Sequence, residues 1–473
     1  IAYGDFMTAM EPFVEWKRQM GVPCEMVSVT TAGGTAVAIQ SYIQNYYDTN
    51  GLTFVLLVGD AEQIPSLSAN GGTSDPSFSL VAGSDTYPDL FVGRFSAETV
   101  AQVETQVLRS VEYEKLPQAG ADWYHRGTGI ASNLGEGDDG EYDDEHMDFI
   151  RDDLLGFTYT EVDTIYDPNP DANASMVAAA LNEGRSIVNY AGHGSYLGWV
   201  SSSFANSDVN ALTNDNMLPF IWSVACVNGM FSGRTCFAEA WVRATNGSEP
   251  TGAVATLMSS INQDWDEPMD AQDEMVDLLV TGVKRTFGGL SMNGCCHMLD
   301  EYGEFAENEF LSWHIFGDPS LRVRTDTPAA LSVSHAASAT PGDLSLEVTV
   351  EGVEGALCAL SHGGVSYGAA FTDAGGTAVI DIEGVLPVNE DVAVTVTSFN
   401  ATPYFGSVHV GEGYDAIIDA VPLFLSVSME PDGTATDTLT IGNAGEPLSV
   451  LHYSIEIADS GMTRSFDGSG ITV

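Results

Sequence analysis

Asn-Tyr-Ala-Gly-His-Gly-Ser, residues 189–195, and Ser-Val-Ala-Cys-Val-Asn-Gly, residues 223–229, are the two stretches of this 473-residue sequence that decide its fold. Each stretch ends an apolar run rich in β-branched and aromatic residues, which predicts a buried strand. A glycine-marked turn follows each run, so His193 and Cys226 are expected at the C-terminal ends of their strands. In open α/β sheets, ligands bind at this edge.

A cysteine and a histidine in these positions predict acyl-transfer chemistry. A thiolate is a far better nucleophile than a thiol, and an imidazole takes the proton and later delivers it to the leaving amine. The backbone N–H groups of Gly194 and Cys226 are candidate donors of an oxyanion hole. A lone Val-Ala-Cys-Val run is usually core packing, but a histidine between two glycines is not typical of a core strand. The pair therefore indicates a cysteine peptidase.

Further motifs occur in a fixed order along the first 326 residues. Over this region the chain resembles the gingipains, secreted bacterial cysteine endopeptidases with a caspase-like fold, and among them the arginine-specific members. The matching motifs lie at residues 13–17, 55–60, 91–96, 189–195, 223–229, 261–263, 285–289 and 316–321.

The resemblance implies a role for each reactive residue. Cys226 is the nucleophile, His193 is the general base and acid, and the amides of Gly194 and Cys226 form the oxyanion hole. The family places a carboxylate that orients the histidine after an Ile-Ala-Ser strand end, here residues 130–132, and Glu136 is the nearest candidate. If Glu136 is only a solvated loop acid, a Cys–His dyad still operates more slowly.

The resemblance also implies a pocket for an arginine side chain. Asp143 aligns with the aspartate that binds the guanidinium, and Asp144 is the neighbouring alternative. A carboxylate suits arginine because its two oxygens accept a bidentate, charge-assisted pair. The remaining pocket residues that the resemblance implies are Val224, Gln263, Trp265, Met269 and Ala191, which replaces a threonine of the arginine-specific members.

A purely structural interpretation of this wall is that Trp265 and Met269, spaced i, i+4, pack a helix start against the core. Pro268 and three neighbouring acids argue against a regular helix there. A helix is expected only from residue 270 to residue 281.

An Asp-rich turn at residues 83–89 spaces two carboxylates four residues apart, and such oxygen ligands suit calcium. Without the resemblance, the same turn is more often plain turn chemistry. The gingipains bind calcium at the matching loop, which implies a structural Ca²⁺ site in this chain. The implied ligands are Asp60, Asp85 and Asp89 with the carbonyls of Ala82 and Tyr87, and a further site is implied at Glu141 and His146.

The composition is strongly acidic, with 67 acidic against 15 basic residues and a formal net charge of -52. Such a surface repels nucleic acid, so no nucleic-acid partner is expected. It keeps a protein soluble in high salt or attracts basic substrates. The six cysteines show neither a disulfide framework nor metal-ligand spacing.

The pattern of helices and strands predicts four units. Alternating helices and strands up to residue 326 predict an α/β caspase-like region of two subdomains with a mainly parallel sheet. Period-two runs between glycine-rich turns then predict an all-β immunoglobulin-like sandwich, followed by a partial β module. The expected boundaries are 1–126, 127–326, 327–412 and 413–473. Helices are expected at 36–47, 97–115 and 172–181, and strands at 54–58, 90–92 and 253–258.

The sequence shows no signal peptide and no apolar run of membrane-spanning length. Together with the resemblance, this predicts a processed or excised fragment of a larger secreted bacterial precursor, with cell-surface anchoring through a missing C-terminal region left open.

The predicted function is an extracellular endopeptidase that cleaves after arginine. A processing peptidase or sortase-like transpeptidase of the same family uses the same residues and stays an alternative. An alternative of another class is a surface adhesin whose peptidase domain is vestigial, which the intact Cys226 and His193 argue against.

Overall fold

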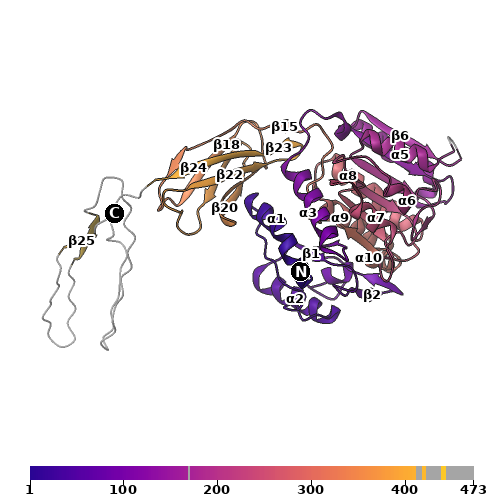
Figure 1. Cartoon of the computed structure of the whole chain (residues 1–473), viewed down its shortest axis with the longest axis horizontal. Helices are drawn as coiled ribbons and strands as arrows, with labels where there is room; N and C mark the ends of the chain where they lie inside the picture. Colours follow the sequence, from indigo (N-terminus) through magenta and orange to yellow (C-terminus); the bar gives the residue numbers. More distant parts are fainter. Residues whose placement is uncertain (169–170, 412–417, 422–437, 444–473) are drawn as a thin grey trace.

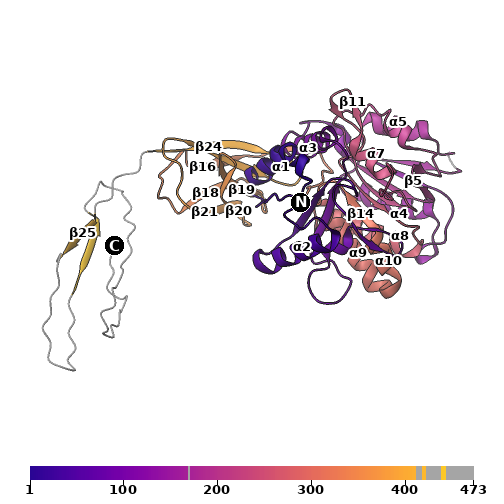
Figure 2. The same cartoon turned by 60° about the horizontal axis from the view of Figure 1, so that its bottom comes forward.

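The computed structural model describes residues 1–168, 171–411, 418–421 and 438–443. An α/β region carries the N-terminus, and a β-sandwich follows it along the chain (Figures 1 and 2). None of the helices in the described ranges is long and apolar enough to cross a membrane.

The centre of the α/β region is one eight-stranded sheet with the order β1-β4-β14-β13-β10-β7-β5-β6. All neighbouring pairs are parallel except β13 with β14, which confirms the expectation of a mainly parallel sheet. The pairing of β14 with β4 joins the two predicted subdomains in one sheet. The strands are β1 (Phe54–Val58), β4 (Phe91–Phe95), β5 (Arg126–Ala131), β6 (Glu161–Tyr166), β7 (Ile187–Ala191), β10 (Phe220–Val224), β13 (Ala255–Ser259) and β14 (Trp313–Phe316).

Helices cover both faces of this sheet. Along β10, Trp222 packs into the core beneath α4, α8 and α9, whereas Ile221 packs into the core beneath α5 and α7. Both faces are therefore apolar, which explains why the strands read as continuous rather than alternating hydrophobic runs. The helices are α1 (Met7–Gln19), α2 (Ala36–Asn50), α3 (Val100–Lys115), α4 (Asp143–Gly156), α5 (Ala174–Glu183), α6 (Asn206–Val209), α7 (Phe237–Arg243), α8 (Asp266–Val280), α9 (Phe287–Tyr302) and α10 (Ala306–Ser312).

The start of α8 differs from the expectation. The helix begins at Asp266, so Pro268 lies in its first turn and the expected boundary at residue 270 was wrong. Proline is tolerated there because the N–H groups of the first turn have no partner within the helix. The acids of this turn, Asp266 and Glu267, face the positive end of the helix dipole and favour the start rather than opposing it.

The sandwich consists of two sheets whose strands alternate buried and exposed residues, as expected for an immunoglobulin-like domain. Val348 and Ile380 of one sheet and Val394 of the other meet in its core. One sheet contains β16 (Val333–His335), β18 (Ser345–Val350) and β21 (Thr377–Asp381), and the other contains β17 (Ser338–Ala339), β24 (Tyr404–Val410), β22 (Asp391–Thr397), β19 (Leu357–His362) and β20 (Val365–Phe371).

The other strands form two-stranded pairs. They are β2 (Leu67–Ala69) with β3 (Gly72–Ser74), β8 (Gly194–Ser195) with β9 (Gly198–Trp199), β11 (Thr245–Asn246) with β12 (Glu249–Pro250), β15 (Ala329–Ala330) with β23 (Ala401–Thr402), and β25 (Ile418–Val421) with β26 (Thr440–Asn443). Apart from β25, β26 and the two residues before β26, the predicted module at 413–473 lies outside the described residues.

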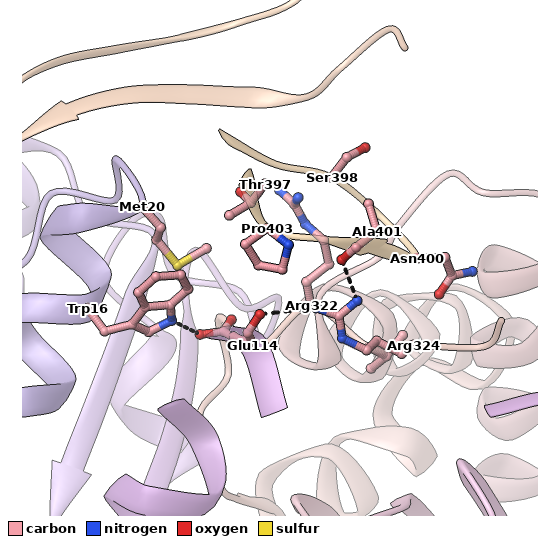
Figure 3. Close-up of a pocket in the computed structure, with 11 residues that line it drawn as sticks. Trp16, Met20, Glu114, Arg322, Arg324, Thr397, Ser398, Asn400, Ala401 and Pro403 are labelled. Carbon is pink, nitrogen blue, oxygen red and sulfur yellow. Dashed lines mark hydrogen bonds between the residues drawn. The ribbon is translucent and has the colours of Figure 1, made fainter. Parts of the chain in front are cut away.

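Arg324 connects the α/β region to the sandwich (Figure 3). Its guanidinium donates to the carbonyl of Ala401 at 2.8 Å and to the carbonyl of Glu114 at 3.1 Å. The Glu114 side chain in turn accepts from Trp16 Nε1 at 2.9 Å and from Lys17 Nζ at 2.7 Å. These buried bonds hold α1, α3 and the sandwich together.

We expect Arg324→Met to lower the free energy of unfolding by about 3 kcal/mol, because it leaves buried carbonyls without donors. The measurement is the urea midpoint. Arg126→Met is the matched control, since Arg126 is only part-buried and lies 3.6 Å from Glu161, and its cost should stay below about 1 kcal/mol. Equal shifts in the two variants would contradict this role of Arg324.

Candidate active site

The parallel register of β7 and β10 brings the two reactive residues to one edge of the sheet. Ala191 at the end of β7 pairs with Val224 at the end of β10. His193 and Cys226 each lie two residues beyond these paired ends. The structure therefore confirms that both residues follow strand C-termini, and it shows that the two strands are neighbours.

Gly194 lies directly against the nucleophile segment. A Cβ atom at this position would lie 2.9 Å from Ala225 Cβ and 3.0 Å from Cys226 N, and closer still to the Cys226 carbonyl. Any other residue would push the histidine turn away from the cysteine turn. The close approach explains the glycine after the histidine.

The Cys226 thiol is half-buried, and its Sγ lies 3.8 Å from the carbonyl oxygen of Gln263. Burial raises the pKa of the Cys226 thiol, and hydrogen bonds from the backbone at Gln263, Gly194 and Cys226 itself act against this rise. Gly194 and Cys226, whose amides are the predicted oxyanion donors, thus lie against one another. Their role as an oxyanion hole stays a prediction.

The His193 side chain is exposed. Two contacts hold the residue, a hydrogen bond to its backbone carbonyl and an edge-on contact of its ring. Its carbonyl accepts a hydrogen bond from the Tyr190 hydroxyl at 2.7 Å. Its ring meets the Trp265 indole edge-on, with 5.0 Å between the ring centroids. Within the described part of the chain the ring makes no hydrogen bond to Cys226, and such contacts often tighten only when substrate binds.

The structure does not bring Glu136 to the histidine. Glu136 is exposed, and its carboxylate accepts from the Tyr142 hydroxyl at 3.2 Å. The carboxylate whose pKa responds to His193 is Asp143. A third catalytic residue at Glu136 stays a prediction.

Asp143 is a fully buried carboxylate at the first position of α4. Its Oδ1 accepts from Trp265 Nε1 at 2.7 Å, and its Oδ2 accepts from the Ser132 hydroxyl. Burial raises the pKa of Asp143, while the hydrogen bonds from Ser132 and Trp265 lower it. The next residue, Asp144, is half-buried and makes no such bonds.

Trp265, which donates a hydrogen bond to Asp143, lines the same small pocket as the nucleophile Cys226. The lining residues of this pocket are Gly192, Val224, Ala225, Cys226, Gln263, Asp264 and Trp265. Val224, Gln263 and Trp265, which the resemblance implied as pocket residues, thus line one pocket with Cys226. Their role in substrate binding stays a prediction.

Two further residues that were predicted to line the pocket, Met269 and Ala191, are not among its lining residues. Met269 lies in the first turns of α8 and is fully buried in the hydrophobic core. This agrees with the purely structural interpretation, in which Met269 packs the start of the helix against the core. Ala191 is fully buried inside β7, between Val224 and Ala131, and does not line the pocket. A substitution at residue 191 therefore reaches the pocket only through the neighbouring strand.

The predicted calcium ligands near residue 85 do not form one cluster. Asp60 Oδ2 lies 3.3 Å from the Arg243 guanidinium, which competes with a cation for this carboxylate. The Asp89 carboxylate accepts hydrogen bonds from the backbone amides of Val81 and Ala82, and the Asp85 carboxylate accepts one from the backbone amide of Tyr87. Asp60 does not fit a calcium site shared with this loop.

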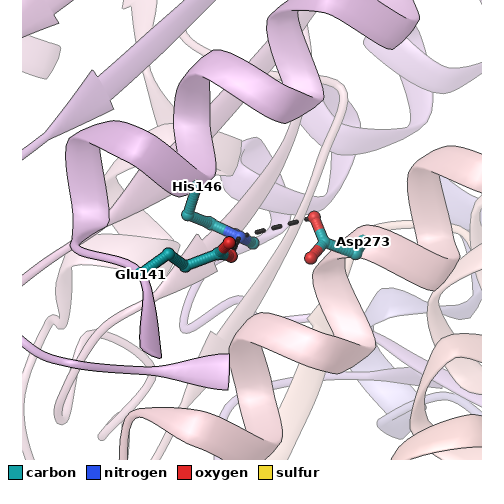
Figure 4. Close-up of side chains that lie close together, drawn as sticks. All are labelled: Glu141, His146 and Asp273. Carbon is teal, nitrogen blue, oxygen red and sulfur yellow. Dashed lines mark hydrogen bonds and ion pairs between the residues drawn. The ribbon is translucent and has the colours of Figure 1, made fainter. Parts of the chain in front are cut away.

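Glu141 and His146 lie together, as expected, and Asp273 joins them (Figure 4). His146 Nδ1 is 3.0 Å from Glu141 Oε1 and 3.4 Å from Asp273 Oδ1, and its Nε2 is 3.0 Å from Gln272 Oε1. Burial alone lowers the pKa of His146, but Asp273 and Glu141 raise it to about 10. In this structure the three side chains form an ion triad. Their ligand atoms also lie close enough together to hold a metal ion, so the site implied at Glu141 and His146 stays a prediction.

Several site residues were missed by sequence reasoning. Ser132 and Gln272 contact predicted residues directly, and Glu309 accepts a hydrogen bond from the backbone amide of Asp264 on the pocket wall. The one available signal was a polar residue on an otherwise apolar helix face, which Gln272 gives in α8.

A cysteine and a histidine at neighbouring strand ends of a mainly parallel sheet suit the chemistry of a cysteine peptidase, and comparison with known proteins places the chain in a peptidase family. The family model "Peptidase family C25" matches residues 1–324, and "Peptidase family C25, C terminal ig-like domain" matches residues 335–411. This chain belongs to peptidase family C25.

Its relatives include three proteins of Porphyromonas gingivalis. Gingipain R1 is 39% identical over 403 residues, which are 83% of this chain and 40% of the relative. Gingipain R2 is 37% identical over 431 residues, 89% of this chain and 58% of the relative. Lys-gingipain is 25% identical over 461 residues, 87% of this chain and 25% of the relative. The chain thus spans about half the length of the two gingipain R proteins and a quarter of Lys-gingipain.

Among solved structures, "Crystal structure of the Arg specific cysteine proteinase gingipain R (RGPB)" superimposes with a TM-score of 0.84 at 37% identity. The match covers 87% of this chain and 96% of that one. The complex of Porphyromonas gingivalis RgpB pro- and mature domains gives the same TM-score and covers 99% of that chain. These matches confirm the caspase-like fold of the α/β region.

We expect Gly194→Ala to slow the alkylation of Cys226 by iodoacetamide at pH 7.5 by at least about tenfold, because the new methyl group clashes with the Cys226 backbone and displaces the turn that carries the thiol. The measurement is the mass-spectrometric yield of modified Cys226 over time. Ser195→Ala is the control, since this half-buried neighbour faces Gly198 rather than the thiol. Equal rates in both variants would contradict the close approach described above.

Proposed function

We propose that the chain is a cysteine endopeptidase that hydrolyses peptide bonds after arginine. The observation that carries this proposal is the buried carboxylate of Asp143, which is bonded to Trp265 on the wall of the pocket that also holds Cys226. The identity of 37–39% to Gingipain R1 and R2, against 25% to Lys-gingipain, supports arginine over lysine.

In the proposed reaction, His193 takes the proton of the Cys226 thiol, and the thiolate attacks the carbonyl carbon of the substrate's arginine residue. The amides of Gly194 and Cys226 stabilise the oxyanion of the tetrahedral intermediate. Its collapse breaks the C–N bond, and His193 gives the proton to the leaving amine. Water, deprotonated by His193, then attacks the thioester, releases the carboxylic acid and restores the thiol.

The arginine pocket follows from the charge and burial of Asp143. Its oxygens already accept Trp265 Nε1 and the Ser132 hydroxyl, so the acid is fixed in one orientation. A planar guanidinium has donors for the remaining lone pairs and stacks on an indole face. An ammonium offers only a point charge, so lysine is bound less tightly.

The decisive experiment measures hydrolysis of matched fluorogenic peptides that end in arginine or lysine. We expect arginine to be preferred, Cys226→Ala to abolish cleavage, and Asp143→Asn to reduce kcat/KM for arginine by about 100-fold with little change for lysine. Asp144→Asn is the control, because Asp144 makes no bond to Trp265 or Ser132. Equal cleavage of both peptides would overturn the role of Asp143, and no cleavage by a folded protein would overturn the peptidase function.

An added amine tests the transpeptidase alternative in the same assay. If an amine nucleophile resolves the acyl-enzyme in place of water, the product is an amide instead of a carboxylic acid. Mass spectrometry distinguishes the two products. If the protein is a hydrolase, the carboxylic acid is the main product, whereas a mainly amide product would support the transpeptidase.

We further propose that the protein works outside the cell. Its formal net charge of -52 suits a cation-rich medium, where screening reduces self-repulsion. The resemblance to a secreted family supports the same location. Calcium at the loop of residues 82–89 belongs to this proposal, with Asp85 and Asp89 as ligands and without Asp60.

Calcium is expected to raise the thermal unfolding midpoint by at least about 3 °C relative to EGTA, because an ion bound only to the folded state stabilises it. Asp89→Asn should remove the calcium-dependent part, since the amide keeps the bonds to Val81 and Ala82 but not the charge. Asp373→Asn is the matched control, because Asp373 also accepts two backbone amides, in the sandwich. A midpoint that does not respond to calcium would exclude this site.

A further inference from the structure

A short hairpin follows His193 and is fastened to the nucleophile segment. It consists of β8 and β9, and residues 196–197 form its tip. The buried side chain of Asn228, two residues after Cys226, donates a hydrogen bond to the carbonyl oxygen of Ser195 at 2.6 Å. The hairpin after the histidine and the turn after the cysteine are therefore one connected unit.

An arginine side chain lies against the tip of this hairpin. The guanidinium carbon of Arg234 is 4.7 Å from the centre of the Tyr196 ring, and both side chains are exposed. None of the ion pairs in the described ranges involves Arg234. An aromatic face attracts the cation through the ring quadrupole and does not take up the N–H donors at the edge of the guanidinium. These donors are available to a ligand.

Exposed positive charge is rare in this chain. It has 15 basic against 67 acidic residues. Among the described residues, Arg234 and Arg285 are the exposed lysines and arginines. Arg285 lies in the loop before α9, whereas Arg234 belongs to the unit that carries the two reactive residues. A cation in this setting stands out because the surface around it repels acidic groups.

Arg234 lies on a different flank of the site from the pocket that Trp265 lines. The pocket is lined by Gly192 and by residues 224–226 and 263–265. In the proposed reaction the substrate arginine enters this pocket, and His193 gives its proton to the leaving amine. The peptide beyond the cleaved bond must therefore pass His193, since a general acid lies within hydrogen-bond reach of the atom it protonates.

The hairpin tip lies within reach of this leaving peptide. Tyr196 is three residues after His193. Three residues of chain span at most about 11 Å. An extended peptide rises about 3.3 Å per residue, so about three substrate residues cover the same distance. A side chain near this position of the substrate can reach the guanidinium on the tip.

We propose that Arg234 determines specificity by binding a carboxylate of the leaving peptide, within about four residues of the cleaved bond. The planar guanidinium donates two parallel hydrogen bonds to a carboxylate, and the Tyr196 ring holds it in place for this contact. The carboxylate belongs either to an acidic side chain or to the C-terminus of a short substrate. This inference rests on the proposed function and adds a second subsite to it.

The test uses quenched-fluorescence peptides with arginine at the cleavage site and a C-terminal amide. Glutamate or glutamine occupies each of the first four positions after the arginine in turn. At the best position we expect glutamate to raise kcat/KM about threefold or more over glutamine. In Arg234→Gln the ratio should fall below one, because the acidic surface then repels glutamate. Arg234→Lys keeps the charge and should keep the ratio above one.

A second peptide set identifies the source of the carboxylate. Its members carry no acidic side chain and end within four residues after the arginine, either as a free carboxylate or as an amide. A preference for the free carboxylate that Arg234→Gln removes would assign the subsite to peptide C-termini. A preference for glutamate in the first set alone would assign it to acidic side chains.

Arg285→Gln is the matched control. Arg285 is also exposed, and its guanidinium carbon lies 4.3 Å from the centre of the Phe399 ring. The substitution removes the same charge away from the hairpin, so both preferences should remain. An equal loss of preference in this variant would overturn the proposal, as would ratios at or below one in both peptide sets with the unmodified chain.

Failure of the proposed function gives a different result. If the folded protein cleaves none of these peptides, the peptidase function is refuted, and the subsite for the leaving peptide is refuted with it. Cleavage after arginine without any preference for a carboxylate refutes the role of Arg234 alone and leaves the peptidase intact.

Discussion

The parallel pairing of β7 with β10 is the constraint on which the site depends. It places the ends of the two strands at the same height, so two turns of the chain leave the sheet side by side. Gly194 then lets the two turns approach until the backbone of one lies against the backbone of the nucleophile in the other. The rigid sheet supplies the position, and the turns supply the reactive groups.

Charge in the interior follows a different rule from charge on the surface. Arg94, Arg109 and Arg185 are each at most 2% exposed, and Arg94 holds the pKa of Asp75 well below its usual range despite burial. The chain has only 15 basic residues, and the interior takes several of them. Buried acids offset these cations, because Asp75, Glu114 and Asp318 are among the acids that are buried too. The large negative charge therefore remains on the surface, where it repels other acidic molecules.

Much of the fold followed from the sequence because its strands are long apolar runs and its reactive turns are marked by glycine. Cys226 and His193 were predicted for this reason, whereas the family resemblance singled out Asp143, Val224 and Trp265. Contacts between distant segments could not be predicted in the same way. Ser132, Asp273 and Glu309 reach the site from other elements, and nothing in their local sequence distinguishes them from ordinary helix or loop residues.

The start of α8 shows a second limit. Pro268 and the acids near it oppose a helix interior but favour its first turn, so the same residues support opposite conclusions until the boundary is known. The position of Asp60 is a third case, because its neutralising partner Arg243 is 183 residues away in the sequence.

The place of β14 in the sheet has a consequence for the order in which the chain becomes structured. This strand, residues 313–316, separates β4 from β13, so β1 and β4 have no bonded link to the catalytic strands before it is made. During synthesis from the N-terminus, roughly two hundred residues separate β4 from β14, and they must all emerge before these two strands can pair. Closing so long a loop is slow. Until then the edges of β4 and β13 are open to pairing with other chains, a risk that a cell must meet with chaperones or with rapid completion of the chain.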